Sequence, residues 1–189
     1  MSIDKDTLTI VLNEYKTLWD YYNTTLAERI NIYDWYFKIV ALPTTVVSVL
    51  FNSDYITLTS DNINAFLYGF YGVVFLVGIS MFVAYTFESA TSTKYYININ
   101  NIRNLLFELA DSNSKKFLYI DEISGQEAKI LSGKFFKSLT VPIINAGIGL
   151  LVLNNFHTWN IGCNVLYYVM ILCIHAILYK AIFKTIIPR

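Results

Sequence analysis

Charge is scarce in this chain. Asp, Glu, Lys and Arg make up 15% of the 189 residues, against about a quarter in typical soluble domains, while apolar residues make up 55%. This imbalance argues against an ordinary soluble fold. Fourteen basic residues are balanced by fourteen acidic ones, so the net charge of zero provides no overall attraction to nucleic acid or to acidic substrates.

Cysteine, proline and glycine are also few. Three prolines and eight glycines in a chain with 16% aromatic residues exclude a collagen-like repeat and a disordered chain. The two cysteines, Cys163 and Cys173, lie ten residues apart in one apolar run. That separation is too long for a disulfide along one helix, and two cysteines are too few for a zinc site. The two cysteines therefore do not indicate whether the protein occupies an oxidising or a reducing compartment.

Long apolar runs stand out in this sequence. A membrane-spanning helix needs about 20 mostly apolar residues to cross the hydrocarbon of a bilayer. Residues 67–87 meet this requirement and contain no side chain that is charged at pH 7. Residues 164–183 are interrupted only by His175 and Lys180. We predict that both segments span a membrane.

Two shorter apolar windows, 35–51 and 139–156, complete a set of four predicted spans. Each contains a proline near its start, Pro43 and Pro142, which spanning helices tolerate where neighbouring helices satisfy the backbone. Either proline is a candidate kink and gate, or only a packing feature near a helix start. An aromatic belt is predicted at the start of the first span, at Trp35, Tyr36 and Phe37.

The basic residues predict which side of the membrane each segment occupies. All fourteen fall in residues 1–38, in 88–138 or in 180–189, and none in 52–66 or the turn around His157. By the positive-inside rule, both termini and the middle segment face the cytoplasm. A soluble bundle of four buried helices, the alternative, gives no reason for this sorting. We expect a multi-pass protein of the cytoplasmic (inner) membrane.

Two amphipathic helices are predicted on the cytoplasmic side. Residues 6–34 contain no proline or glycine and place apolar side chains at spacings of three and four, among them Leu8, either Val11 or Leu12, Trp19 and Ile30. The pattern returns after the second span, between Tyr95 and Leu109. Because each apolar stripe needs a partner, we expect the two helices to pair as an antiparallel stalk.

The predicted fold is therefore an all-α integral membrane protein with four transmembrane helices and a cytoplasmic helical stalk. Its predicted segments, in chain order, are a cytoplasmic amphipathic helix at 1–34, a transmembrane hairpin at 35–87, a cytoplasmic helix plus irregular loop at 88–138, a second transmembrane hairpin at 139–183 and a cytoplasmic tail at 184–189.

His175 is the most informative polar residue, because it falls near the middle of the last span. An ionisable group there is costly, so a functional role is the first hypothesis. The ring either lines a pore and responds to protons, or is a neutral imidazole hydrogen-bonded across the bundle, for example to Asn145. Asn145 is itself a candidate pore-lining or interhelical residue. Close helix contacts are predicted at the small residues Ala146, Gly147, Gly149, Gly69, Gly72 and Gly78.

The irregular segment 111–134 is either a tether between the two hairpins or a small recognition surface. Lys115 and Lys116, together with Arg103 on the preceding helix, are candidate contacts for a partner or for anionic lipid. Two adjacent lysines fall short of the four to eight basic residues typical of a lipid-binding cluster. The other interpretation of these lysines is a solvated loop.

The residue sets that carry enzyme chemistry are missing. Neither histidine is close in sequence to a carboxylate on the same predicted side of the membrane, and there is no Walker A, GxSxG, HExxH or CxxC motif. The predicted spans contain no Asp or Glu, which disfavours proton-coupled transport of the carboxylate type. We expect no enzyme activity, no cofactor and no metal.

The arrangement of residues 8–110 resembles a known class of small bacterial membrane proteins. A tyrosine-rich helix (VLNEYKTLWDYYNTTLAERINIYDWYF) runs into a span, and a second span leads into a second helix (YYININNIRNLLFEL). This is similar to the SLATT-type effectors of anti-phage and nucleotide-signalling systems, although these typically have two spans. The four-span membrane subunit of the Kiwa anti-phage system is a second candidate. The resemblance implies an effector that oligomerises and forms a pore or perturbs the bilayer when triggered.

The function expected from the sequence is an oligomeric membrane effector or pore-forming component of a bacterial anti-phage or stress-response system, gated from its stalk. The alternative is a non-conducting membrane anchor that recruits a cytoplasmic partner protein. The expected partners are the lipid bilayer, further copies of the chain and a cytoplasmic protein. Nucleic-acid binding is not expected.

Overall fold

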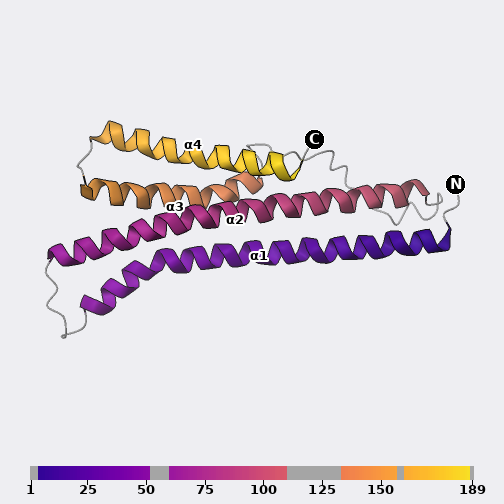
Figure 1. Ribbon diagram of the computed structural model, residues 1–189, viewed down its shortest axis with the longest axis horizontal. Coiled ribbons are helices and arrows are strands. Elements are labelled where there is room, and N and C mark those ends of the chain that lie inside the picture. The colour runs from indigo at the N-terminus through magenta and orange to yellow at the C-terminus, as the bar shows by residue number, and fades with distance from the viewer. Residues whose placement is uncertain (1–3, 52–59, 110–132, 157–159, 188–189) are drawn as a thin grey trace.

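The computed structural model describes residues 4–51, 60–109, 133–156 and 160–187. They form four helices, α1 (Lys5–Phe51), α2 (Ser60–Leu109), α3 (Gly133–Phe156) and α4 (Ile161–Ile186) (Figure 1). No strand occurs within these ranges, and the prediction of an all-α fold is confirmed. The segment that contains Lys115 and Lys116 lies outside the described residues.

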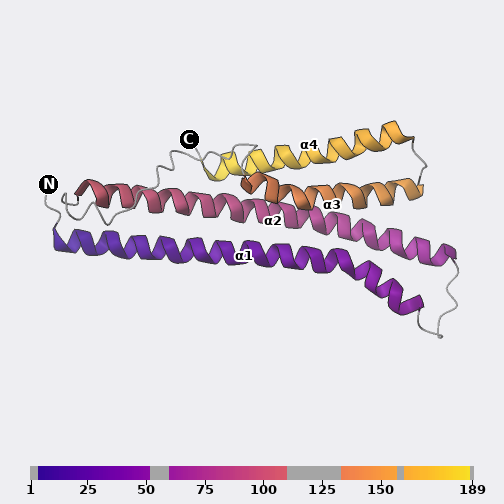
Figure 2. The same ribbon diagram turned by 180° about the vertical axis from the view of Figure 1, so that it is seen from behind.

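The two long helices α1 and α2 lie side by side, and α3 and α4 lie along only one half of them (Figures 1 and 2). Two parts of different construction result. We call α3, α4 and the adjoining residues 33–51 and 60–90 the four-helix part. We call residues 5–32 and 91–109 the two-helix extension. The chain ends and the beginning of α3 lie toward the extension (Figure 2).

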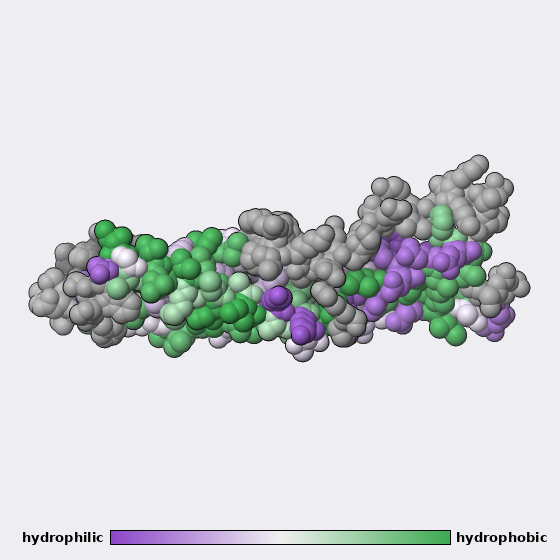
Figure 3. Space-filling model, turned by 90° about the horizontal axis from the view of Figure 1, so that it is seen from above, coloured by the Kyte–Doolittle hydropathy of each residue, from purple (hydrophilic) through white to green (hydrophobic). Residues whose placement is uncertain are grey.

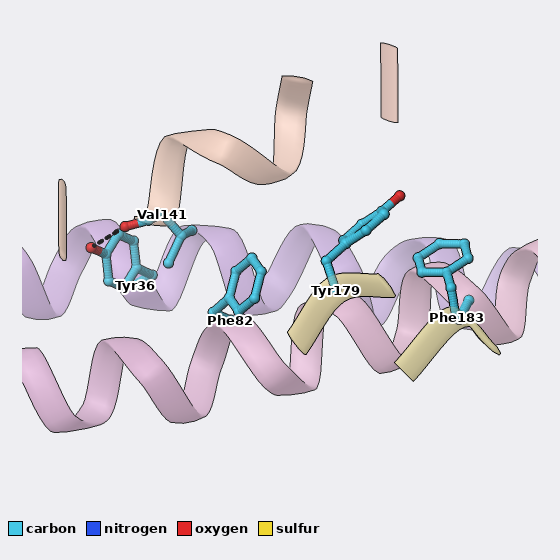
Figure 4. Packing of buried hydrophobic residues seen from close by; sticks show 6 residues of the cluster. Tyr36, Phe82, Val141, Tyr179 and Phe183 are labelled. Atoms are coloured by element: carbon cyan, nitrogen blue, oxygen red, sulfur yellow. Dashed lines mark hydrogen bonds between the residues drawn. The ribbon is translucent and has the colours of Figure 1, made fainter. Parts of the chain in front are cut away.

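A core cluster ties all four helices together in the four-helix part (Figure 4). Its buried members are Tyr36 from α1, Phe82 and Ala90 from α2, Val141 from α3, and Tyr179 and Phe183 from α4. The Tyr36 hydroxyl lies 3.3 Å from the Val141 carbonyl oxygen, one of two acceptors that share its single hydrogen; the other is Asn145 Oδ1. Because each helix contributes to one cluster, removing any of them would expose apolar surface of the other three.

The pairing of α1 with α2 is antiparallel and uses aromatic rings. Tyr21 stacks on Tyr95 with ring centroids 5.6 Å apart, and Tyr33 meets Tyr85 edge to face at 5.1 Å. Residue numbers that rise along α1 thus meet numbers that fall along α2. Such aromatic pairs contribute about 0.5–1.5 kcal/mol each beyond the area that they bury.

The apolar stripe predicted on α1 is only partly covered by α2. Leu8, Leu12, Trp19 and Ile30 remain 39%, 48%, 41% and 62% exposed. The expectation that the whole stripe is buried against the second helix is wrong at Leu8, Trp19 and Ile30, whereas Val11, the alternative to Leu12, is partly buried. The physical reason is the width of the stripe, because one partner helix covers only part of the circumference of another.

Pro43 and Pro142 both lie inside helices. Pro43 is buried within α1 and Pro142 within α3. Proline lacks a backbone N–H and therefore removes one helical hydrogen bond. α1 bends in its last third and α3 near its beginning, the parts of each helix that contain these prolines (Figure 1). The kinks have an ordinary chemical cause, and a gating role for them stays a prediction.

Two helices are long and apolar enough to cross a membrane. They are the helix stretch Asn64–Leu109 of α2 and the whole of α4, and α3 contains a shorter apolar stretch, Ser138–Asn154. The structure thus supports two of the four predicted spans by length and composition. That α1 and α3 also cross the bilayer stays a prediction.

The outside of the four-helix part is apolar. Large apolar side chains with more than half of their surface exposed occur on both candidate spans, including Ile161 at 83%, Leu166 at 70%, Ile177 at 67% and Leu76 at 64%. On the face drawn in Figure 3 the coloured residues of the left half, which belong to the four-helix part, are mostly hydrophobic, whereas hydrophilic residues gather toward the right. A water-soluble bundle has a mainly polar exterior, whereas the exterior of this four-helix part is mainly apolar.

Candidate functional site: a buried polar cluster

Asn145 of α3 joins three helices through its amide group. The side chain is fully buried, and its Oδ1 lies 3.3 Å from the Tyr36 hydroxyl of α1, which donates to it. Its Nδ2 donates to the backbone carbonyl of Phe75 in α2 at 3.4 Å. In apolar surroundings such amide bonds between helices contribute about 0.6 kcal/mol on average. Asn145 thus fixes α3 against both long helices.

Gly78 provides the space for this amide. A Cβ atom at Gly78 would overlap the side chain of Asn145, so any other residue there would force the Asn145 amide to move. Gly149 is similarly crowded, since its Cβ would lie 2.8 Å from the Tyr167 hydroxyl oxygen. Close contact was expected at these two positions and is found.

The same expectation is wrong at the other glycines. Gly69, Gly72 and Gly147 have no atom within 4 Å of an added Cβ. They lie on helices as part of the same small-residue pattern but do not meet a neighbour. Sequence spacing alone does not say which face of a kinked helix touches its neighbours.

Tyr36 has a role that the sequence analysis missed. It was assigned to an aromatic belt with Trp35 and Phe37, and those two are 58% and 43% exposed, whereas Tyr36 is fully buried. The helix turns about 100° per residue, so three consecutive aromatics cannot share one face. Tyr36 lies on the same helix face as two other buried residues: Leu18 and Thr25 are seven residues apart, and Thr25 and Tyr36 are eleven apart. Both spacings are close to whole numbers of helical turns, which is the signal that could have indicated the burial of Tyr36.

His175 belongs to the buried stripe of α4 formed by Ile171, His175, Tyr179 and Phe183. The residue is 2% exposed. Its Nδ1 lies 2.8 Å from the Ile171 carbonyl oxygen, and its ring meets Phe82 of α2 edge to face at 4.7 Å between centroids. Nε2 has no hydrogen-bond partner among the described residues.

The hydrogen bond between His175 and Asn145 that we considered as an alternative is not formed. The Asn145 amide is directed to Tyr36 and Phe75, and the His175 ring is directed to its own helix. The two polar residues therefore occupy the same bundle without touching through hydrogen bonds. The physical reason is that each has a nearer acceptor or donor.

A row of small hydroxyl side chains on α2 was not singled out from the sequence. Thr86, Ser89, Ser92 and Thr93 are buried, and the hydroxyls of Thr86, Ser92 and Thr93 donate to backbone carbonyls of their own helix. Bonds of this kind satisfy the donors without a partner helix. Because these side chains are short, neighbouring helices can approach this face of α2 closely near the end of the predicted span 67–87.

An acidic side chain lies at the junction of the two parts. Glu88 directly follows the predicted span 67–87, and burial, together with the nearby Glu28 carboxyl of α1, raises the pKa of Glu88. The Arg29 guanidinium lies 6.0 Å from the centre of the Tyr85 ring beside it. Arg103, farther along the extension, is half-buried.

The described residues offer no constellation for metal or thiol chemistry. No group of three or more His, Cys, Asp or Glu within the described ranges is placed to hold a metal ion. Cys163 and Cys173 are both free thiols on the exposed surface of α4. The arrangement holds helices together and presents one unsatisfied imidazole nitrogen.

Comparisons of the chain with protein-family models, with curated proteins and with solved structures found no match. The resemblance to SLATT-type effectors and to the Kiwa membrane subunit therefore rests on the arrangement of the sequence alone.

Proposed function

We propose that this protein is an oligomeric membrane effector or pore-forming component of a bacterial anti-phage or stress-response system. One observation supports the proposal that the protein is embedded in a membrane. The four-helix part is apolar outside and encloses the polar side chains of Asn145 and His175. Polar residues inside a membrane face the interior of a bundle and lipid covers the apolar exterior. The cellular system is supported by the resemblance alone.

In this proposal all four helices cross the bilayer together. α1 and α3 pack on α2 and α4 through one core cluster, so they share the depth of the two candidate spans. The distribution of basic residues supports the orientation, with both termini and the middle segment in the cytoplasm. The two-helix extension then forms the cytoplasmic stalk.

A pore in this proposal forms between copies rather than within one chain. The space between the four helices is occupied by buried side chains such as Tyr36, Phe82 and Tyr179. A conducting path therefore needs several chains arranged around an axis. Homo-oligomerisation also covers part of the exposed apolar surface.

The stalk is connected to the four-helix part by one continuous helix, α1. α1 runs from Lys5 to Phe51 and carries Tyr36, whose hydroxyl contacts Asn145 on α3. A displacement of the stalk therefore acts on the α3–α4 hairpin through this contact. This is the route by which we expect a cytoplasmic trigger to open the pore.

Ion flux from vesicles tests the pore directly. Full-length wild-type protein and Tyr36→Phe, with Tyr21→Phe as the matched control on an exposed part of the stalk, are reconstituted into liposomes with a potassium gradient. We expect wild type and Tyr21→Phe to show the same low basal flux in the absence of a trigger. Tyr36→Phe lacks the hydroxyl contact between α1 and α3 and is expected to show a higher flux. Absence of flux above protein-free vesicles in all three would contradict the pore.

A specific observation favours the second candidate function, a non-conducting anchor for a cytoplasmic partner. The exposed side chains of Leu8, Leu12, Trp19 and Ile30 form an uncovered apolar surface on the extension. Such surfaces mark interaction sites when they face water. Stoichiometric co-purification of a soluble protein that is lost in Trp19→Ala, without any ion flux, would support the anchor instead.

A further inference from the structure

The imidazole of His175 is held in one tautomer by its own helix. The Ile171 carbonyl oxygen can only accept, so the nitrogen 2.8 Å from it, Nδ1, carries the hydrogen. In the neutral ring the other nitrogen, Nε2, is then a bare acceptor. It is buried, and among the described residues no donor reaches it.

A buried acceptor without a donor is unusual in a packed structure. More than nine in ten buried polar groups find a partner, and an unsatisfied one costs roughly 1–3 kcal/mol. On the α2 side the ring meets Phe82 in a T-shaped arrangement, with 4.7 Å between ring centroids, and Phe82 offers no hydrogen-bond donor. The free lone pair of Nε2 is therefore the position of this ring to which a proton can bind.

The surroundings provide no counter-charge for a protonated ring. The helices packed on this part of α4 are α2 and α3, and residues 64–87 and 138–156 contain no Asp, Glu, Lys, Arg or other His. The titratable side chains of the buried surroundings are Tyr36, Tyr85 and Tyr179. Lys180, five residues along α4, is exposed and carries the same sign of charge as an imidazolium.

We propose that Nε2 of His175 is a proton-binding site, and that proton binding there separates α4 from α2. A proton on Nε2 creates a second N–H donor and a positive charge in buried surroundings that contain no counter-charge. A buried, unpaired charge is costly, so the packed arrangement is the one that loses stability. Rotation or outward movement of α4 brings the ring to water or to lipid headgroups, where the charge is solvated.

This inference concerns the packing of α4 on α2 and does not require that the chain forms a pore. A proton-dependent change in packing without ion flux would therefore support it while contradicting the pore. Conversely, ion flux together with packing that does not change with pH would leave the pore proposal intact and contradict this inference.

Nitrogen NMR of the two histidines tests the site in the wild-type protein. The full chain is labelled with ¹⁵N-histidine and reconstituted in nanodiscs, and His157→Gln assigns the signal of His175. At pH 7.5 we expect the neutral tautomer with hydrogen on Nδ1, and at pH 5.0 a second, imidazolium population. An Nε2–H tautomer at pH 7.5, or one unchanged neutral signal at pH 5.0, overturns the proposal.

Thermal unfolding measures the consequence for packing. Circular dichroism at pH 7.5 and pH 5.0 is compared for wild type, His175→Phe and the control His157→Gln. We expect the Tm of wild type and of His157→Gln to fall by about 3 °C or more on acidification, and that of His175→Phe not to fall. The same fall in His175→Phe contradicts the proposal, and the NMR result decides if that variant does not fold.

Discussion

Single residues in the bundle are fixed by space as much as by hydrogen bonds. Gly78 and Asn145 form the clearest pair, because the amide occupies the position of the missing Cβ. Gly72, six residues earlier on α2, has open space around it and provides a matched control. The pair permits a test at the level of individual atoms.

Gly78→Ala is expected to lower the free energy of unfolding by about 1–3 kcal/mol, because the new methyl group overlaps Asn145. Gly72→Ala is expected to be neutral or to stabilise by up to about 1 kcal/mol, since alanine is the better helix former. Thermal unfolding in micelles measures both.

The double variant Gly78→Ala with Asn145→Ala isolates this contact. Removing the amide removes the overlap, so the double variant should be more stable than the sum of the two single changes predicts, by roughly 1 kcal/mol. Strict additivity of the two changes would show that the side chain of Asn145 does not occupy this position.

Glu88 and His175 are expected to change the stability of the fold with pH in opposite directions. Acidification lowers stability through His175 and raises it through Glu88. Burial and the neighbouring Glu28 raise the pKa of Glu88 in the folded chain, so the folded state binds this proton more tightly than the unfolded state does. The associated stability is present at acidic pH and is lost as the pH rises through the raised pKa.

Glu88→Gln should therefore stabilise the chain at pH 7 and have no effect near pH 4. Because the carboxyl is only half-buried, solvent screening keeps the gain to about 0.5 kcal/mol. Glu14→Gln, at an exposed position of α1, is the control, and equal effects of the two substitutions at pH 7 would contradict the assignment.

Whole helices pair where small residues let them approach. Ala90 is fully buried in the core cluster, whereas Ala84, six residues earlier on α2, is exposed. Ala90→Leu forces about three extra carbon atoms into a packed contact and is expected to lower stability by about 1–3 kcal/mol. Ala84→Leu points outward and should change it little. A stable, unchanged Ala90→Leu variant would place the core elsewhere.

The helices themselves were largely predictable from the sequence. Apolar run length and the 3.6-residue period predicted the ends of α1 and α3 at Phe51 and Phe156, as observed. Helix α3 begins at Gly133, before the predicted span 139–156 and within the predicted segment 88–138. Polar residues at a helix start hide it from a search for apolar runs.

The partners of each side chain were much less predictable. Asn145 and His175 were singled out because polar groups are costly in an apolar span, a property of one residue. Tyr36 and the hydroxyl row from Thr86 to Thr93 were missed, because their importance depends on which face meets another helix. That information comes from the packing of all four helices and is absent from any one segment.

The whole molecule consists of two parts with different surfaces. The four-helix part has an apolar exterior, and the two-helix extension is charged. If the bilayer surrounds the four-helix part, the extension and the start of α4 must lie on opposite sides of it. The proposed proton site at His175 would then lie within the bilayer.

Cysteine labelling tests this arrangement most directly. In a Cys163→Ser and Cys173→Ser background, Thr24→Cys places a thiol on the exposed face of the extension and Asn160→Cys places one at the exposed beginning of α4. We expect a membrane-impermeant maleimide to label Asn160→Cys in intact bacterial spheroplasts, and Thr24→Cys only after permeabilisation. Equal labelling of both thiols from one side, or recovery of the chain in the soluble fraction, would contradict the membrane arrangement.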